Sequence, residues 1–138
     1  MSTDAILDAS LLEQIAFDAA GLVPVVAQQF DTGEVLMLAW MNRDAVRETL
    51  LRRQVCYWSR SRAALWRKGE TSGQHQRLVE LRLDCDGDAL LALVDQSGVA
   101  CHTGRRDCFY RAARPQGWTP IAEPLVAPER LYRATADH

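Results

Sequence analysis

Two pairs of short apolar segments, each joined by a turn rich in Asp and Gly, limit what this chain can fold into. Residues 23–29 and 34–41 flank Asp31-Thr32-Gly33, and residues 78–85 and 89–96 flank Asp86-Gly87-Asp88. Short apolar runs bounded by such turns are typical of β-hairpins. The sequence therefore predicts two β-hairpins, one in each half of the chain.

The expected helices are few and short. Ser10-Leu11-Leu12-Glu13 resembles a capping box, which would open a helix that Gly21 can close. Asn42 can cap a second helix over residues 43–53. Further short strands are expected at residues 55–59 and 108–112, whereas the polar residues 60–77 suit an ordered functional loop. These patterns predict an α+β fold with more strand than helix.

The length of 138 residues fits one domain, with residues 1–9 as a loose leader and residues 113–138 as a Pro-containing tail. No apolar run approaches the roughly 20 residues that a membrane span needs, and the acidic first 14 residues are not expected to be a secretory signal. The net charge of −2 provides no global basic field for nucleic acid. The four cysteines, without a secretory signal, favour metal or catalytic roles over disulfides.

An acidic turn is the first candidate site. Asp84, Asp86 and Asp88 would offer hard oxygen ligands for Mg²⁺, although solvated hairpin turns also contain Asp and Gly. If residues 84–86 are extended, Cys85 points away from Asp84 and Asp86. This geometry suggests two separate sites, or one site completed by another subunit.

Three cysteines and one histidine form the second candidate. Cys85, Cys101 and Cys108 match no standard zinc-finger spacing, but three thiolates fit an open zinc site. His102 could be the fourth ligand or a general acid/base beside a metal-bound water. Buried free cysteines are a common alternative, and Cys56 in its apolar run fits that alternative best.

The third candidate is a cradle for phosphate. Hydroxyl, guanidinium, ammonium and glycine groups are what such a cradle uses, although a solvated charged loop has the same composition. Its candidate substrate-binding residues are Ser59, Arg60, Ser61, Arg62, Lys68, Thr71 and Ser72. Arg105 could add a second positive patch, which would suit a substrate with two phosphates.

Several motifs resemble those of one family. They are Ala39-Trp40-Met41-Asn42, the segments 57–62 and 65–73, Asp84-Cys85-Asp86-Gly87-Asp88, and the segment 100–109. In this order, over about residues 21 to 112, they are similar to the phosphoribosyl-AMP cyclohydrolases of histidine biosynthesis. Asp107 is a departure, because that family more often has Ser before the last cysteine.

The resemblance implies a cytoplasmic homodimer with strongly bent, barrel-like antiparallel sheets and two short helices. It implies Zn²⁺ on Cys85, Cys101 and Cys108, with ligands shared between subunits, and Mg²⁺ on Asp84, Asp86 and Asp88. It also implies hydrolysis of the N1–C6 bond in the adenine ring of phosphoribosyl-AMP, which gives the phosphoribosylformimino-AICAR phosphate intermediate. In this hypothesis zinc activates the water, His102 transfers the proton, and the cradle orients the phosphoribosyl arms.

Other classes stay open at this point. A zinc-dependent purine deaminase would use related chemistry, but its H-x-E…P-C-x-x-C signature is missing. A small zinc-stabilised nucleic-acid-binding module conflicts with the acidic carboxylates, which would repel phosphate. A purely structural metal protein would unfold on chelation and show no turnover.

Overall fold

The computed structural model describes residues 10–131, so the expected leader at residues 1–9 lies outside the described residues. The described chain is mainly β. Its strands are β1 (Val23–Gln29), β2 (Val35–Met41), β3 (Cys56–Ser59), β4 (Ala64–Arg67), β5 (Gln76–Leu83), β6 (Leu90–Gln96), β7 (Arg111–Arg114) and β8 (Gly117–Pro120). Its helices are the 3₁₀ helix η2 (Leu12–Gln14) and the α-helices α2 (Arg43–Arg52) and α3 (Pro128–Leu131).

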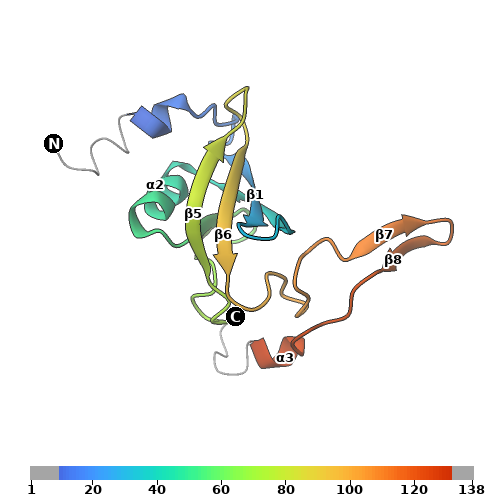
Figure 1. Cartoon of the computed structure of the whole chain (residues 1–138). Coiled ribbons are helices and arrows are strands. Elements are labelled where there is room, and N and C mark those ends of the chain that lie inside the picture. The colour runs from blue at the N-terminus through green and yellow to red at the C-terminus, as the bar shows by residue number, and fades with distance from the viewer. Residues whose placement is uncertain (1–9, 132–138) are drawn as a thin grey trace.

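A four-stranded sheet with the order β2-β1-β6-β5 is the centre of the molecule (Figure 1). The two expected hairpins, β1–β2 and β5–β6, are both present and antiparallel. They join along β1 and β6, which run parallel to each other. In both of these central strands every second residue is buried, because alternate side chains of a strand point to opposite faces.

Helix α2 packs against β2, β3 and β5. The side chain of Asn42 accepts a 2.9 Å hydrogen bond from the backbone N–H of Ala45, which confirms the expected cap. Ala45 and Val46 are fully buried in the core beneath this helix. The core continues into β3, where Cys56 and Tyr57 are buried, so Cys56 is the buried free cysteine that its apolar run indicates.

Two small hairpins lie outside the central sheet. Strands β3 and β4 pair with each other, and strands β7 and β8 form a separate arm. In Figure 1 this arm projects away from the four-stranded sheet. Trp118 and Leu125 are the most exposed large apolar side chains in this region, at 73% and 70%.

The expectation of barrel-like antiparallel sheets is wrong. Strands β2 and β5 are the two edges of an open sheet and do not pair, and the small hairpins form sheets of their own. The β1–β6 pair is also parallel, not antiparallel. The turn signals within each hairpin were visible in the sequence, but the pairing between hairpins depends on packing.

Two local expectations also need correction. The helix that the sequence predicts from residue 10 toward Gly21 is much shorter in the structure, where η2 ends at Gln14 and residues 15–18 are not helical. The Asp18 carboxylate instead accepts bonds from the N–H groups of Ala20 and Leu22, which stabilises a turn. Residues 60–77 are not one loop, because Ala64–Arg67 forms β4 against β3 and β5 begins at Gln76.

The expected strand near residues 108–112 begins later than predicted. It is β7, at Arg111–Arg114, and it enters the region that the sequence assigned to the Pro-containing tail. Part of that tail is therefore ordered, as β8 and the short helix α3. Gly117, the first residue of β8, adopts φ +122°, which permits the tight turn that joins the two strands of the arm.

Candidate active site

The three aspartates of the β5–β6 turn converge. Carboxylate oxygens of Asp84, Asp86 and Asp88 all lie within 4.8 Å of one another, and all three residues are exposed. Residues 84–88 form a turn and are not extended. The alternation expected for an extended strand, with Cys85 pointing away from Asp84 and Asp86, therefore does not apply. Three converging carboxylates are a donor set that fits Mg²⁺, so these residues could hold that cation.

Hydrogen bonding makes the aspartates unequal. The backbone N–H of Asp88 donates a 3.0 Å hydrogen bond to Oδ1 of Asp84. Desolvation acts to raise the pKa of Asp84, but this bond and the N–H groups of Ala89 and Gly87 outweigh it and lower that pKa. The hydrogen bond and negative charge of Asp84 raise the pKa of Asp88. Such mutual repulsion is the condition that a bound cation relieves.

A pair of thiols lies at the other end of the sheet, after β6. Cys108 as a residue is exposed, yet partial desolvation of its thiol, together with the charge and hydrogen bond of the Cys101 thiol, raises the pKa of Cys108 to about 12. The Cys101 thiol is buried and accepts a 3.1 Å hydrogen bond from Oγ1 of Thr103. Two adjacent thiols fit a soft metal such as zinc, for which they would supply two ligands.

Cys85 and His102 are not gathered with this pair. Among residues 10–131, the three aspartates are the only group of three or more candidate ligands whose atoms all lie within 4.8 Å. Cys85 belongs to the β5–β6 turn, whereas Cys101 follows the far end of β6 (Figure 1). The seven residues of β6 rise about 3.3 Å each, so the two ends of this strand are ~20 Å apart.

Lys68 connects the thiol pair to a pocket. Its Nζ donates a 2.9 Å hydrogen bond to the carbonyl of Ala100, next to Cys101. Burial lowers the pKa of Lys68, and the neighbouring Cys108 and Cys101 thiols act in the opposite direction. The same side chain lines a pocket of about 640 Å³ between α2, β4 and the start of β5.

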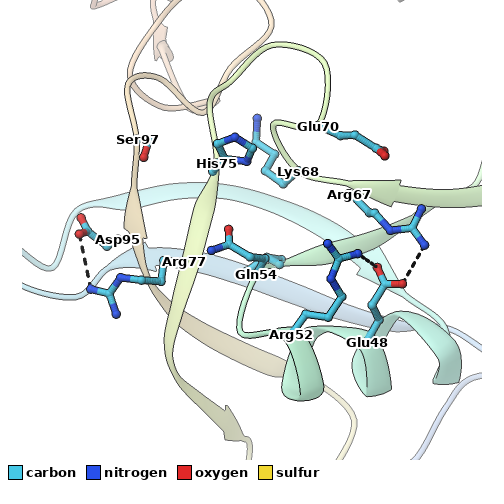
Figure 2. Close-up of a pocket in the computed structure, with 11 residues that line it drawn as sticks. Glu48, Arg52, Gln54, Arg67, Lys68, Glu70, His75, Arg77, Asp95 and Ser97 are labelled. Carbon is cyan, nitrogen blue, oxygen red and sulfur yellow. Dashed lines mark hydrogen bonds and ion pairs between the residues drawn. The ribbon is translucent and has the colours of Figure 1, made fainter.

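Figure 2 shows this pocket, whose charged side chains are mostly paired. The Glu48 carboxylate bonds Arg67 at 2.8 Å and lies 3.9 Å from Arg52. Across the pocket, Arg77 pairs with Asp95 at 3.5 Å. The polar lining and the volume suit a charged small molecule. The five paired residues just named share no motif and come from separate elements, so the sequence did not predict them. Only the polar segment around Lys68 indicated this part of the chain.

The expected phosphate-cradle residues lie in three places. Ser59 ends β3, and Arg60, Ser61 and Arg62 lie in the β3–β4 turn, where the Arg60 guanidinium stacks 4.6 Å from the centre of the Trp40 ring. Thr71 and Ser72 lie in the loop before β5, close in sequence to Lys68. Arg105 stacks on Tyr110 and donates to the carbonyl of Ala122 at the base of the arm. Of the expected cradle residues, Lys68 is the one that lines the pocket.

Comparison with known proteins gives consistent matches. The family model for phosphoribosyl-AMP cyclohydrolase matches residues 37–110. A phosphoribosyl-AMP cyclohydrolase of Paramagnetospirillum magneticum is 63% identical over 129 residues, which cover 94% of this chain and 98% of the relative. One of Rhodospirillum centenum is 67% identical over 130 residues, covering 94% and 97%, and one of Rhodospirillum rubrum is 62% identical over 127 residues, covering 91% and 89%.

These matches identify an enzyme of the hydrolase class, in which the pocket and the neighbouring thiol pair are the candidate site. Within the described residues no helix is long and apolar enough to cross a membrane. The chain belongs to the phosphoribosyl-AMP cyclohydrolase family.

Proposed function

We propose that this protein hydrolyses the N1–C6 bond of the adenine ring in phosphoribosyl-AMP, a step of histidine biosynthesis in the cytoplasm. The family membership supports the reaction. The single structural observation that carries it is Lys68, which lines the 640 Å³ pocket and bonds the residue before Cys101. A bound purine nucleotide would therefore lie beside the thiol pair.

In this proposal Cys85, Cys101 and Cys108 hold Zn²⁺, and Asp84, Asp86 and Asp88 hold Mg²⁺. Bound zinc would supply a water acidic enough to be a nucleophile near neutral pH. The exposed His102, next to Cys101, would deliver a proton to N1 as the N1–C6 bond breaks and oxygen is added at C6. The cationic side chains of the pocket and of the β3–β4 turn would bind the two phosphates and orient the ring.

The position of Cys85 supports a site shared between two copies of the chain. One chain cannot bring its Cys85 to its own Cys101 and Cys108 across the length of β6. A second copy could present its β5–β6 turn to the thiol pair. The exposed apolar side chains Phe109 and Trp118, next to Cys108, would gain a partner surface in such a homodimer.

Turnover of phosphoribosyl-AMP, followed by ultraviolet absorbance, tests the reaction. Ring opening that is abolished by chelation and restored by Zn²⁺, without release of ammonia, is the expected result. Ammonia release would instead identify a deaminase, because that reaction expels the exocyclic amino group. No turnover by a folded protein supplied with Zn²⁺ and Mg²⁺ would overturn the proposed function.

Mixing two inactive variants tests the shared site. Cys85→Ser and Cys101→Ser should each abolish activity alone. If a site takes Cys85 from one copy and Cys101 from the other, a mixed dimer contains one intact site, and random remixing restores about a quarter of the sites. Mixing Cys101→Ser with Cys108→Ser is the matched control and should restore nothing, because both residues come from the same copy. Equal recovery in the two mixtures, or none in either, would contradict a shared site.

A further inference from the structure

Residues 97–100 begin the loop that carries Cys101 and His102, and side chains from outside this short segment hold their carbonyls. Four consecutive carbonyls, those of residues 97–100, each accept a hydrogen bond from a buried or half-buried side chain. The donors are Gln96 to Ser97 at 2.9 Å and to Val99 at 3.2 Å, Arg106 to Gly98, and Lys68 to Ala100 at 2.9 Å. The N–H of Val99 also donates to Oε1 of Gln74 at 2.8 Å. The path of the loop into Cys101 therefore depends on these side chains.

Gln96 is the central donor, and two buried residues fix the direction of its amide. Tyr57 donates a 2.6 Å hydrogen bond from its hydroxyl to Oε1 of Gln76. Gln76 in turn donates from Nε2 to Oε1 of Gln96 at 2.8 Å. With its oxygen occupied in this way, Gln96 must direct Nε2 toward the loop carbonyls. Tyr57 and Gln76 are fully buried, so water cannot replace either partner.

The second thiol is anchored differently. The backbone N–H of Cys108 donates a 2.8 Å hydrogen bond to the carbonyl of Leu36 in β2. The hydrogen-bonded series Tyr57–Gln76–Gln96, here called the glutamine relay, holds the segment before Cys101 to β3, β5 and β6. Cys108 is held instead to β2. The separation of the two thiols depends on both anchors.

We propose that Gln96, oriented by Gln76 and Tyr57, is a positioning residue that sets the geometry of the Cys101–Cys108 metal site. The proposal rests on the proposed function, since it takes these thiols as zinc ligands. Removing the Gln96 amide leaves the Gln76 amide and the loop carbonyls without their partner inside the core. The loop then relaxes, and Cys101 moves relative to Cys108. Partners that orient metal ligands in this way commonly contribute about 10–100-fold in metal affinity.

Titration of the purified full-length protein with Co²⁺ tests this inference, because thiolate ligation to Co²⁺ gives visible absorption bands. Gln96→Met keeps the length of the side chain but removes its hydrogen bonds. It should weaken Co²⁺ affinity by about 10–100-fold and reduce the thiolate bands. Gln28→Met is the matched control on β1; Gln28 bonds only the Gly33 carbonyl in the β1–β2 turn among the described contacts, and its loss should leave Co²⁺ binding unchanged.

Thermal unfolding of the metal-free variants separates positioning from stability. A Gln96→Met protein that melts earlier but binds Co²⁺ with wild-type affinity and spectrum would overturn the proposal. If Gln96→Met does not fold, Tyr57→Phe decides, because it removes only the hydroxyl that starts the relay. A several-fold loss of Co²⁺ affinity in folded Tyr57→Phe supports the proposal, and wild-type affinity overturns it. The test measures metal binding and not turnover of phosphoribosyl-AMP, so the two proposals can fail independently. If the proposed function alone is wrong, wild-type protein will bind Co²⁺ but will not turn over phosphoribosyl-AMP.

Discussion

Arg67 donates a 2.8 Å hydrogen bond from Nη2 to the Glu48 carboxylate, and this contact ties helix α2 to strand β4. Glu48 is the more buried partner, with 19% of its side chain exposed. Burial acts to raise the pKa of Glu48, but the hydrogen bond and charge of Arg67 outweigh it and hold that pKa below its usual value. The pair therefore stabilises the wall of the pocket shown in Figure 2.

The first prediction concerns this pair. Glu48→Gln should lower the free energy of unfolding by about 1 kcal/mol at pH 7, because a charged hydrogen bond is lost. A carboxylate whose folded pKa is lowered contributes stability above its unfolded pKa of about 4.3, and that contribution disappears as the pH falls through the lower folded pKa. The difference between variant and wild type, measured by urea unfolding, should shrink toward pH 3. An unchanged difference over that range would contradict this assignment.

Gly69 and Gly73 provide a matched pair of substitutions. Both have positive φ, at +83° and +80°, so alanine is strained at either position. A Cβ at Gly69 would also lie 2.5 Å from the backbone of Gln74, whereas one at Gly73 would meet nothing within 4 Å. Gly69→Ala should therefore destabilise the protein by at least about 1 kcal/mol more than Gly73→Ala, because the backbone beside Lys68 must move. Equal thermal unfolding of the two variants would be inconsistent with the close approach.

The thiols should differ in reactivity. Burial, with the hydrogen bond and charge of Glu48, raises the pKa of Cys56 to about 12, so its reactive thiolate is scarce at pH 8. Cys56 should stay unmodified by iodoacetamide in the folded, chelated protein and react once urea unfolds it. Cys85 is exposed and should react in the folded protein. Peptide mass spectrometry reads both sites, and rapid native labelling of Cys56 would show that the β3 core opens readily.

His102 is predicted to move protons and not to hold the metal. His102→Ala should keep the bound zinc content but lower kcat by about 100-fold or more, as removal of a general acid commonly does. Added imidazole should restore part of the rate, which would not happen if the residue only supported the fold. Loss of zinc from the variant, measured by atomic absorption, would make His102 a ligand, and near-normal kcat would exclude the proton-transfer role.

Arg60 is predicted to bind substrate. Its guanidinium is held over the Trp40 ring in the exposed β3–β4 turn and makes no ion pair that the described structure records. Arg60→Ala should raise KM with little change in kcat, because it removes a phosphate contact made equally in the ground and transition states. Arg82→Ala is the control, since Arg82 pairs with Glu80 on β5 and should leave KM unchanged. An unaltered KM in Arg60→Ala would remove the β3–β4 turn from the cradle.

Local features were largely predictable from the residues. The turns at 31–33 and 86–88 marked the hairpins, and Asn42 marked the start of α2. The Asp84–Asp88 cluster was predictable for the same reason: its ligands are neighbours in the chain, and one turn brings them together. The helix expected up to Gly21 ends instead at Gln14, and the Asp18 side chain holds a turn in its place by accepting bonds from Ala20 and Leu22.

The sequence by itself determined the family, the strand-rich class and the residue types at the candidate metal sites, because these depend on local pattern and composition. Only the tertiary structure decided that the hairpins join as an open sheet through parallel β1 and β6, and that Lys68 reaches both the pocket and Ala100. It also decided that Cys85 is separated from Cys101 by the length of β6, and that Tyr57, Gln76 and Gln96 form one relay. Such contacts join residues that are far apart in the chain. They form because the folded core buries these polar groups together, and a buried polar group without a hydrogen-bond partner is costly.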